Sequence, residues 1–131
     1  MIHALIVALG IKVIFIEAFL SPTCGSYYDN TKIITLNLQP YCDPNEKLYH
    51  EMGHAAFLHD QEVRSFIKKY PAPKYYYTAQ YPTADSRLDE KVADYFVMYV
   101  KYPDFGVKFP EIKRLFDKKV HNIIQQSLLS Q

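Results

Sequence analysis

The chain has 131 residues, of which 49% are hydrophobic and 22% are charged. This length predicts a single domain over residues 1–131, and the composition is typical of a soluble globular protein. The formal net charge of +1 gives no reason to expect nucleic acid or an acidic membrane as a partner. The two cysteines, Cys24 and Cys42, lack the spacing of a zinc finger, and the sequence leaves open whether they pair.

Two interpretations fit the apolar residues 1–20. They resemble a signal peptide, but no positive charge precedes them, and Lys12 and Glu17 interrupt the apolar run. The same charges argue against a membrane-spanning helix, which needs about 20 mainly apolar residues. We therefore expect a short helix that ends at Gly10 and a buried strand over residues 12–19. This interpretation favours a cytoplasmic protein, with secretion as the alternative.

A β-hairpin is predicted after this strand. Residues 27–28 and 32–38 have strand character, and Asp29-Asn30-Thr31 between them can form the turn. Apolar and polar residues alternate along 32–38, so one face of this strand should be buried and the other polar.

Helices are predicted over the rest of the chain. Asp43 can cap a helix, Pro44 suits its first position, and Glu46 follows the cap by three residues. This helix is apolar over much of its surface, which predicts that it is buried. The remaining helices are expected over residues 60–70, over residues 85–101, and from Pro110 onward as an amphipathic scaffold.

The first of these long helices contains the pattern His50-Glu51-Met52-Gly53-His54. Residues four apart lie on one face of a helix, so His50 and His54 can direct their imidazole nitrogens at the same point. Glu51 lies beside that point. Two imidazoles and an adjacent carboxylate are the ligands and the base that a zinc-dependent hydrolase requires. Histidines at this spacing also arise by chance, so the prediction depends on a third ligand.

Glu90, on the helix predicted over residues 85–101, is the expected third ligand of a Zn²⁺ ion. Asp94 follows one turn later and would contact the outer nitrogen of one ligating histidine, which fixes its tautomer. The alternative is that both acids belong to a solvated helix face. His59 is the competing ligand, but it follows His54 by five residues and would point elsewhere on a continuous helix.

These residues predict hydrolysis of a peptide bond. Glu51 would take a proton from the zinc-bound water and deliver it to the leaving amine. A tyrosine from the long loop over residues 71–85 would stabilise the oxyanion. Tyr81 is the first candidate because it lies shortly before Glu90, and the alternatives are Tyr75, Tyr76 and Tyr77. Packing in the core is the other interpretation for each tyrosine.

The two motifs together resemble the gluzincin pattern of zinc metallopeptidases, in which two histidines and a downstream glutamate bind the ion. The segment Glu90-Lys91-Val92-Ala93-Asp94 is similar to the second motif, with Ala93-Asp94 where the family usually has Ala-Glu. The layout also resembles minigluzincins and anthrax-lethal-factor-like catalytic domains. This resemblance implies an α+β fold, in which a small mixed sheet is followed by the active-site helix, the glutamate helix and a C-terminal scaffold helix.

The resemblance further implies how a peptide or protein substrate would bind. Residues 32–38 would form the sheet edge above the cleft, where an extended peptide adds a strand through backbone hydrogen bonds. The substrate-binding candidates are Thr35 and Asn37 of this strand and Tyr77 of the loop.

Three functions are compatible with these features. The main hypothesis is a zinc-dependent endopeptidase. A second is a regulatory peptidase that cleaves one dedicated partner protein. A third is a latent or non-proteolytic zinc-binding protein of the toxin type. Glu51 argues against the third, because a structural zinc site has four protein ligands and needs no base.

Overall fold

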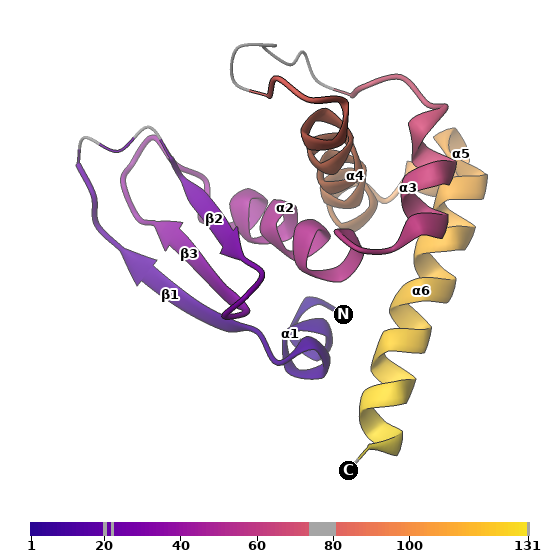
Figure 1. The fold of residues 1–131 in the computed structure, drawn as a ribbon, viewed down its shortest axis with the longest axis horizontal. Coiled ribbons are helices and arrows are strands. Elements are labelled where there is room, and N and C mark those ends of the chain that lie inside the picture. Colours follow the sequence, from indigo (N-terminus) through magenta and orange to yellow (C-terminus); the bar gives the residue numbers. More distant parts are fainter. Residues whose placement is uncertain (20, 22, 74–80, 131) are drawn as a thin grey trace.

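The computed structural model describes residues 1–19, 21, 23–73 and 81–130. Within these residues it contains six helices and one three-stranded mixed sheet, so the predicted α+β fold class is confirmed. The sheet lies on one side of the molecule and most of the helices on the other, with α2 (Pro44–Phe57) between them (Figure 1). Among the described residues, no helix combines the length and the apolar character needed to cross a membrane.

The N-terminal helix α1 (Ile2–Leu9) ends as predicted at Gly10, whose φ of 67° lies in the left-handed region that glycine adopts without strain. Strand β1 (Lys12–Ile16) follows and pairs in parallel with β3 (Ile33–Asn37). The prediction of a buried strand over residues 12–19 is wrong. The strand ends at Ile16 and lies at one edge of the sheet, where Phe15 is 59% exposed. Helix α2 packs against the other two strands, which leaves β1 largely uncovered.

The predicted hairpin is confirmed, because β2 (Gly25–Tyr28) pairs antiparallel with β3. The strand order β1-β3-β2 makes β3 the central strand. The prediction that residues 32–38 form the sheet edge above the cleft is therefore wrong. Strand β1 occupies one side of β3 and β2 the other, so β2 is the edge strand nearest to α2 (Figure 1).

Cys24 and Cys42 form a disulfide. Cys24 immediately precedes β2, and Cys42 immediately precedes Asp43, the N-cap residue of α2. A cross-link over 18 residues restricts the unfolded chain and stabilises the fold by about 3 kcal/mol in the loop-entropy description. The disulfide therefore joins the start of the edge strand to the start of the helix that it covers.

Helix α2 begins as the sequence predicts. The carboxylate of Asp43 accepts hydrogen bonds from the backbone N–H groups of Asn45 and Glu46, at 3.1 and 3.2 Å. These bonds satisfy two of the donors that a helix start leaves unpaired. Met52 and Phe57 are fully buried, so α2 is fixed between the sheet and the remaining helices.

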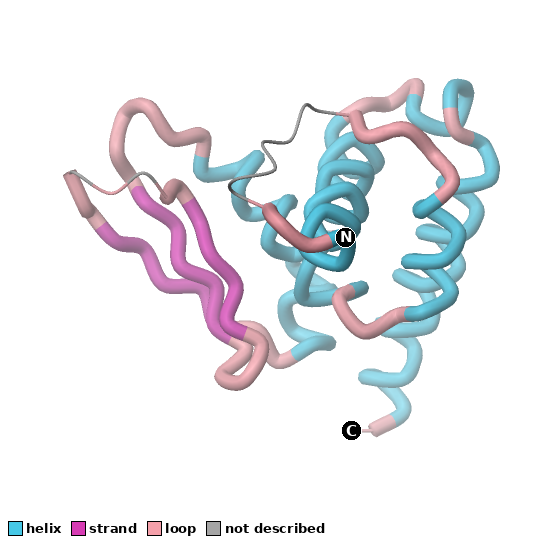
Figure 2. Tube along the Cα trace, turned by 45° about the horizontal axis from the view of Figure 1, so that its top comes forward, coloured by secondary structure: helices cyan, strands magenta, loops and turns pink. Residues whose placement is uncertain are grey.

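The helices lie together on one side of the sheet (Figure 2), and they include α3 (Gln61–Lys68), α4 (Ala84–Lys101), α5 (Phe105–Lys108) and α6 (Pro110–Leu129). Helix α4 is capped by Thr83, whose hydroxyl accepts a hydrogen bond from the backbone N–H of Ser86. Phe57 of α2 packs against Phe96 of α4 and Phe116 of α6, with ring centroids 5.5 and 5.1 Å away, and these two rings also contact each other. Helix α6 is therefore the predicted scaffold, whereas α5 was not predicted.

Candidate metal centre

Helices α2 and α4 approach each other closely at Gly53. A Cβ atom added at Gly53 would lie 2.9 Å from the Cα of Ala93 and 3.1 Å from the Cβ of Phe96. A larger residue would therefore push α4 away from α2, since real Cβ atoms essentially never approach backbone so closely. The small residue inside the histidine motif brings Glu90 within reach of both histidines.

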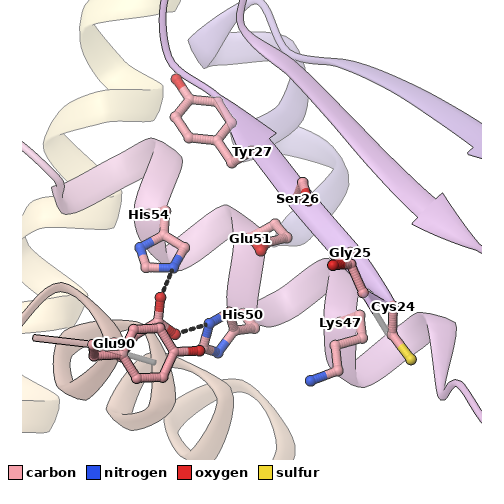
Figure 3. Close-up of a pocket in the computed structure, with 11 residues that line it drawn as sticks. Cys24, Gly25, Ser26, Tyr27, Lys47, His50, Glu51, His54 and Glu90 are labelled. Atoms are coloured by element: carbon pink, nitrogen blue, oxygen red, sulfur yellow. Dashed lines mark hydrogen bonds and ion pairs between the residues drawn. The ribbon is translucent and has the colours of Figure 1, made fainter. Parts of the chain in front are cut away.

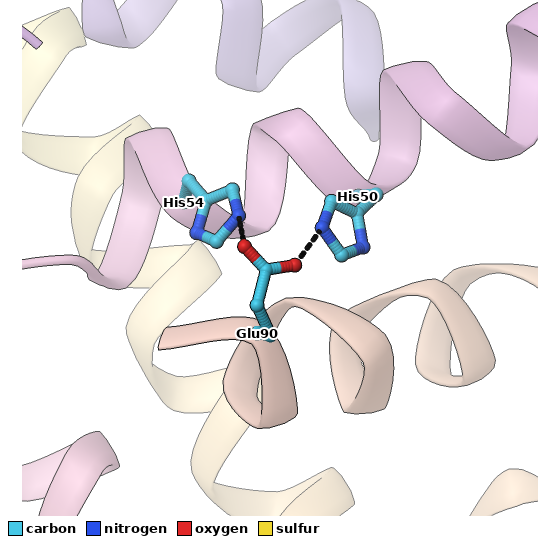
Figure 4. A group of neighbouring side chains, drawn as sticks. All are labelled: His50, His54 and Glu90. Atoms are coloured by element: carbon cyan, nitrogen blue, oxygen red, sulfur yellow. Dashed lines mark hydrogen bonds and ion pairs between the residues drawn. The ribbon is translucent and has the colours of Figure 1, made fainter. Parts of the chain in front are cut away.

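The side chains of His50, His54 and Glu90 converge on one point between the two helices (Figure 4). The Nε2 atom of His50 lies 2.7 Å from one carboxylate oxygen of Glu90, and the Nε2 atom of His54 lies 3.2 Å from the other. One ligand atom from each residue lies within 4.8 Å of the others. This His/His/Glu group could hold a metal ion, and it consists of the three ligands expected from the sequence.

Asp94 contacts the ring nitrogen of His50 that does not face Glu90. Its carboxylate lies 2.9 Å from the Nδ1 atom of His50, and the residue is 3% exposed. A buried carboxylate in this position holds the ring with Nε2 directed at the metal site and makes the ring a more basic ligand. The contact is the one expected from the spacing of Glu90 and Asp94.

The charges of the site depend strongly on these contacts. Burial alone lowers the pKa of the His50 ring, but hydrogen bonds with Asp94 and Glu90 raise this pKa to about 9. Burial opposes ionisation of Glu90, but hydrogen bonds from both histidines hold its pKa below the usual range. Glu90 is therefore anionic, and a metal ion that binds here must displace a proton from His50.

Glu51 is the one side chain with a buried polar atom that finds no hydrogen-bond partner among the described residues. The residue is 6% exposed, and its Oε2 atom makes no hydrogen bond. Burial raises the pKa of its carboxyl, while the nearby rings of His54 and His50 act in the opposite direction. Burial of an unpaired carboxylate is costly. An unpaired oxygen beside a metal-binding group indicates a function that requires it.

Helix α2, strand β2 and the start of α4 enclose a cleft of about 370 Å³ around these residues (Figure 3). Tyr81 lines the cleft, and burial together with the nearby Glu90 carboxylate raises the pKa of its hydroxyl. The guanidinium of Arg87 donates a hydrogen bond of 3.0 Å to the backbone oxygen of Tyr81. Tyr75, Tyr76 and Tyr77 lie outside the described residues.

Thr35 and Asn37, the predicted substrate-binding residues of β3, do not line this cleft but a smaller one that shares Gly25 and Ser26 with it, and their role stays a prediction. Ile34 and Leu36 of β3 are buried, and side chains alternate along a strand, so Thr35 and Asn37 point to the other face of the sheet. Asn37 is 1% exposed, and its amide donates hydrogen bonds to the backbone oxygens of Ala18 and Thr23. These hydrogen bonds hold the segment between β1 and β2 against the end of β3.

His59 takes no part in the metal-binding group, in agreement with the sequence-based prediction. Its ring lies 2.7 Å from Asp29 in an ion pair on the surface, and its side chain is 76% exposed. Arg64 of α3, by contrast, supports the centre indirectly. It forms an ion pair with Asp89, the residue before Glu90, and so holds the start of α4 against α3.

Two parts of the cleft were not predicted from the sequence. One is the continuous segment from Thr23 to Tyr27, which leads into β2, and the other is Lys47 of α2. Lys47 precedes His50 by three residues and therefore shares its helix face, which is a signal that the sequence contains. No pattern in the sequence indicates that β2 borders the cleft, because the position of β2 depends on strand order.

Comparisons of the chain with protein-family models, with curated proteins and with solved structures find no match. The function is therefore inferred from the residues and the geometry of the cleft.

Proposed function

We propose that this protein is a zinc-dependent peptidase in which His50, His54 and Glu90 bind the ion. Two imidazole nitrogens and one carboxylate oxygen are a donor set that suits zinc, and three protein ligands leave a position for water. The Asp94 carboxylate on the outer nitrogen of His50 supports the same assignment. The resemblance to gluzincins leads to the same proposal.

The observation that carries the proposal is the unpartnered Oε2 atom of Glu51. A structural zinc site would use a fourth protein ligand and would have no need of a buried base. Glu51 is instead held beside the ligands without a partner, although a polar or smaller residue would be less costly there. This arrangement favours hydrolysis over a non-proteolytic role for the metal.

A bound zinc ion would acidify a water molecule and polarise the carbonyl of the substrate. Glu51 accepts the proton at its free Oε2 atom and returns it to the leaving amine. The raised pKa of the Glu51 carboxyl suits this exchange, because a base with a pKa nearer to neutrality also acts as an acid.

The edge strand β2 offers a place for the substrate backbone. Gly25, Ser26 and Tyr27 line the cleft (Figure 3), and in the described part of the chain no strand pairs with the outer side of β2. An extended peptide can add to this edge through backbone hydrogen bonds, which would hold its scissile bond over Glu51. The proposed docking strand is therefore β2 rather than residues 32–38.

Tyr81 is proposed to donate its hydroxyl to the oxyanion, because it reaches the cleft next to Glu90. Replacement of Tyr81 by phenylalanine should lower kcat by about tenfold, the value of one hydrogen bond to a charged group, and leave zinc bound. Peptide-cleavage kinetics and the zinc content of the purified variant measure both effects. An unchanged kcat would remove Tyr81 from the mechanism.

Removal and return of the metal tests the proposal as a whole. Treatment with a chelator should abolish cleavage of a pool of unstructured peptides, and about one equivalent of Zn²⁺ per chain should restore it. Mass spectrometry of the peptides identifies the cleaved bonds. Cleavage by the metal-free protein, or no cleavage by the zinc-loaded protein, would rule out the peptidase.

The disulfide bears on where this peptidase would act. Disulfides persist in oxidising environments and are rare in the cytosol, so the Cys24–Cys42 pair favours secretion, the alternative, over the expected cytoplasmic location. A peptidase dedicated to one partner protein would use the same chemistry and stays a prediction from the sequence.

A further inference from the structure

The cleft-facing side of α2 contains one residue that the proposed reaction does not use. Lys47 lines the cleft together with His50, Glu51 and His54 (Figure 3). Their positions in the sequence differ by three, four and seven residues, which places them in one stripe along a helix. Lys47 is thus presented to the substrate by the same helix that presents the metal ligands and the base.

The position of Lys47 is set by tight packing under the edge strand. A Cβ atom added at Gly25 would lie 3.3 Å from the Cβ of Lys47 and 3.5 Å from the Cγ of Glu51. The strand therefore rests on the stems of both side chains. The Cys24–Cys42 disulfide joins the two chain segments directly before this contact. The Cβ end of the Lys47 side chain is therefore held in place under Gly25, and the side chain lines the cleft (Figure 3).

Lys47 is the only lysine or arginine among the described residues that line the cleft. Its Nζ atom forms no hydrogen bond or ion pair with the described residues, but its charge acts on the nearby Glu51 carboxyl in the direction of a lower pKa. The two carboxylates in the same cleft, Glu51 and Glu90, together balance the double charge of a zinc ion. With Asp94 paired to His50, the positive charge of Lys47 acts on the Glu51 carboxyl and faces the space that the substrate must occupy.

We infer that Lys47 selects substrates by binding a carboxylate close to the scissile bond. This inference rests on the proposed peptidase function and adds a substrate class, namely peptides with a carboxylate next to the cleaved bond. The same chemistry is available from an acidic side chain and from a free C-terminus. An ammonium group on a flexible stem accepts either, since it acts as a point charge with three donors.

Three sets of synthetic octapeptides test the inference. The first set moves a single glutamate along a scaffold of alanine and glycine with both ends blocked, and the second set carries glutamine instead. The third set repeats the glutamine peptides with a free C-terminal carboxylate. Dissociation constants are measured with zinc-loaded Glu51→Gln protein, which keeps the peptides intact, and kcat/KM is measured with the wild-type protein.

At one glutamate position, or with the free C-terminus, the peptide should bind about tenfold more tightly than its neutral counterpart. Lys47→Gln should remove this preference, and Lys47→Glu should reverse it. Lys12→Gln removes one positive charge at an exposed position outside the cleft and should leave the preference unchanged. The set that shows the preference identifies the source of the carboxylate.

The outcomes separate this inference from the proposed function. Equal cleavage of acidic and neutral peptides by the wild-type protein and by Lys47→Gln would overturn the role of Lys47 and leave the peptidase intact. A Lys47-dependent preference in binding without any cleavage would support the anion site and contradict the peptidase. If Lys47 acted only through Glu51, its replacement would change all peptides by the same factor, and this result would also overturn the inference. The inference would also be overturned if none of the peptides bound to the protein.

Discussion

Replacement of Glu51 by glutamine should abolish peptide cleavage and leave the zinc ion bound. Glutamine has the shape of glutamate but cannot accept a proton, and the loss of a general base lowers a rate by about 10²- to 10⁴-fold. The proposed metal ligands His50, His54 and Glu90 are untouched, so the affinity for zinc should change little. The expected result is a folded, zinc-loaded and inactive protein.

The same substitution makes a second prediction about stability. Glu51 buries a carboxylate oxygen that has no partner in the described part of the chain, and the cost of this burial is greatest for the charged form. A neutral amide avoids that cost, so the melting temperature of Glu51→Gln should equal or exceed that of the wild-type protein. Most substitutions of a buried residue lower the melting temperature. A site residue kept for its chemistry should behave in the opposite way.

Metal analysis, thermal melting and cleavage of the same peptide pool measure the three effects. Glu46→Gln is the matched control, because Glu46 lies on the same helix but does not line the cleft. It should retain zinc and activity. Cleavage that survives in Glu51→Gln would contradict the role of Glu51 as base, and loss of zinc in this variant would contradict the assignment of the ligands.

The start of α2 and its histidine motif could be predicted because their determinants are local. Asp43 caps the helix through atoms two and three residues away, and the two histidines share a face because they lie one turn apart. Glu90 and Asp94 were predicted by the same argument on α4. Their distance from His50 depends on a contact that no spacing reveals, namely the close approach of Ala93 to Gly53.

The sheet was predicted less well, because strand order is not a local property. The apolar residues 13–16 indicate a strand but do not distinguish a buried centre from an exposed edge. Strand β1 pairs in parallel with β3, which leaves β2 as the edge strand above α2. The expectation that residues 32–38 form the sheet edge follows from this error in strand order, whereas Thr35 and Asn37 point away from the cleft because side chains alternate along β3.

The position of Lys47 depends both on local helix periodicity and on the order of the strands. Its helix face follows from the sequence, whereas its position beneath Gly25 follows from the packing of β2 on α2. The disulfide fixes the same contact, and its pairing could not be decided from two cysteines alone. The candidate metal centre was thus largely predictable, but the surface proposed to select the substrate was not.

Substitutions at Glu90 and Asp94 should weaken zinc binding to different extents. Binding of structural zinc contributes about 10–16 kcal/mol through all its ligands, so one ligand corresponds to about 3 kcal/mol. Glu90→Gln removes a charged ligand and should lower the affinity for zinc about a hundredfold or more. Asp94→Asn keeps an oxygen that can accept the hydrogen bond from His50 and removes only the charge, so the loss should be about tenfold.

Competition with a chelating dye measures these affinities, and Asp85→Asn on the same helix is the matched control. The side chain of Asp85 is 92% exposed and lies outside the cleft, so its replacement should leave zinc affinity unchanged. At saturating zinc, Asp94→Asn should recover most of its activity, because Asp94 acts on the site through His50 and does not line the cleft. Glu90→Gln should stay impaired even when loaded, because the neutral amide leaves the ion with a higher charge and a weaker third ligand. Equal losses in the two variants would show that Asp94 is itself a ligand and that the helix α4 presents the metal with a different face from the one proposed.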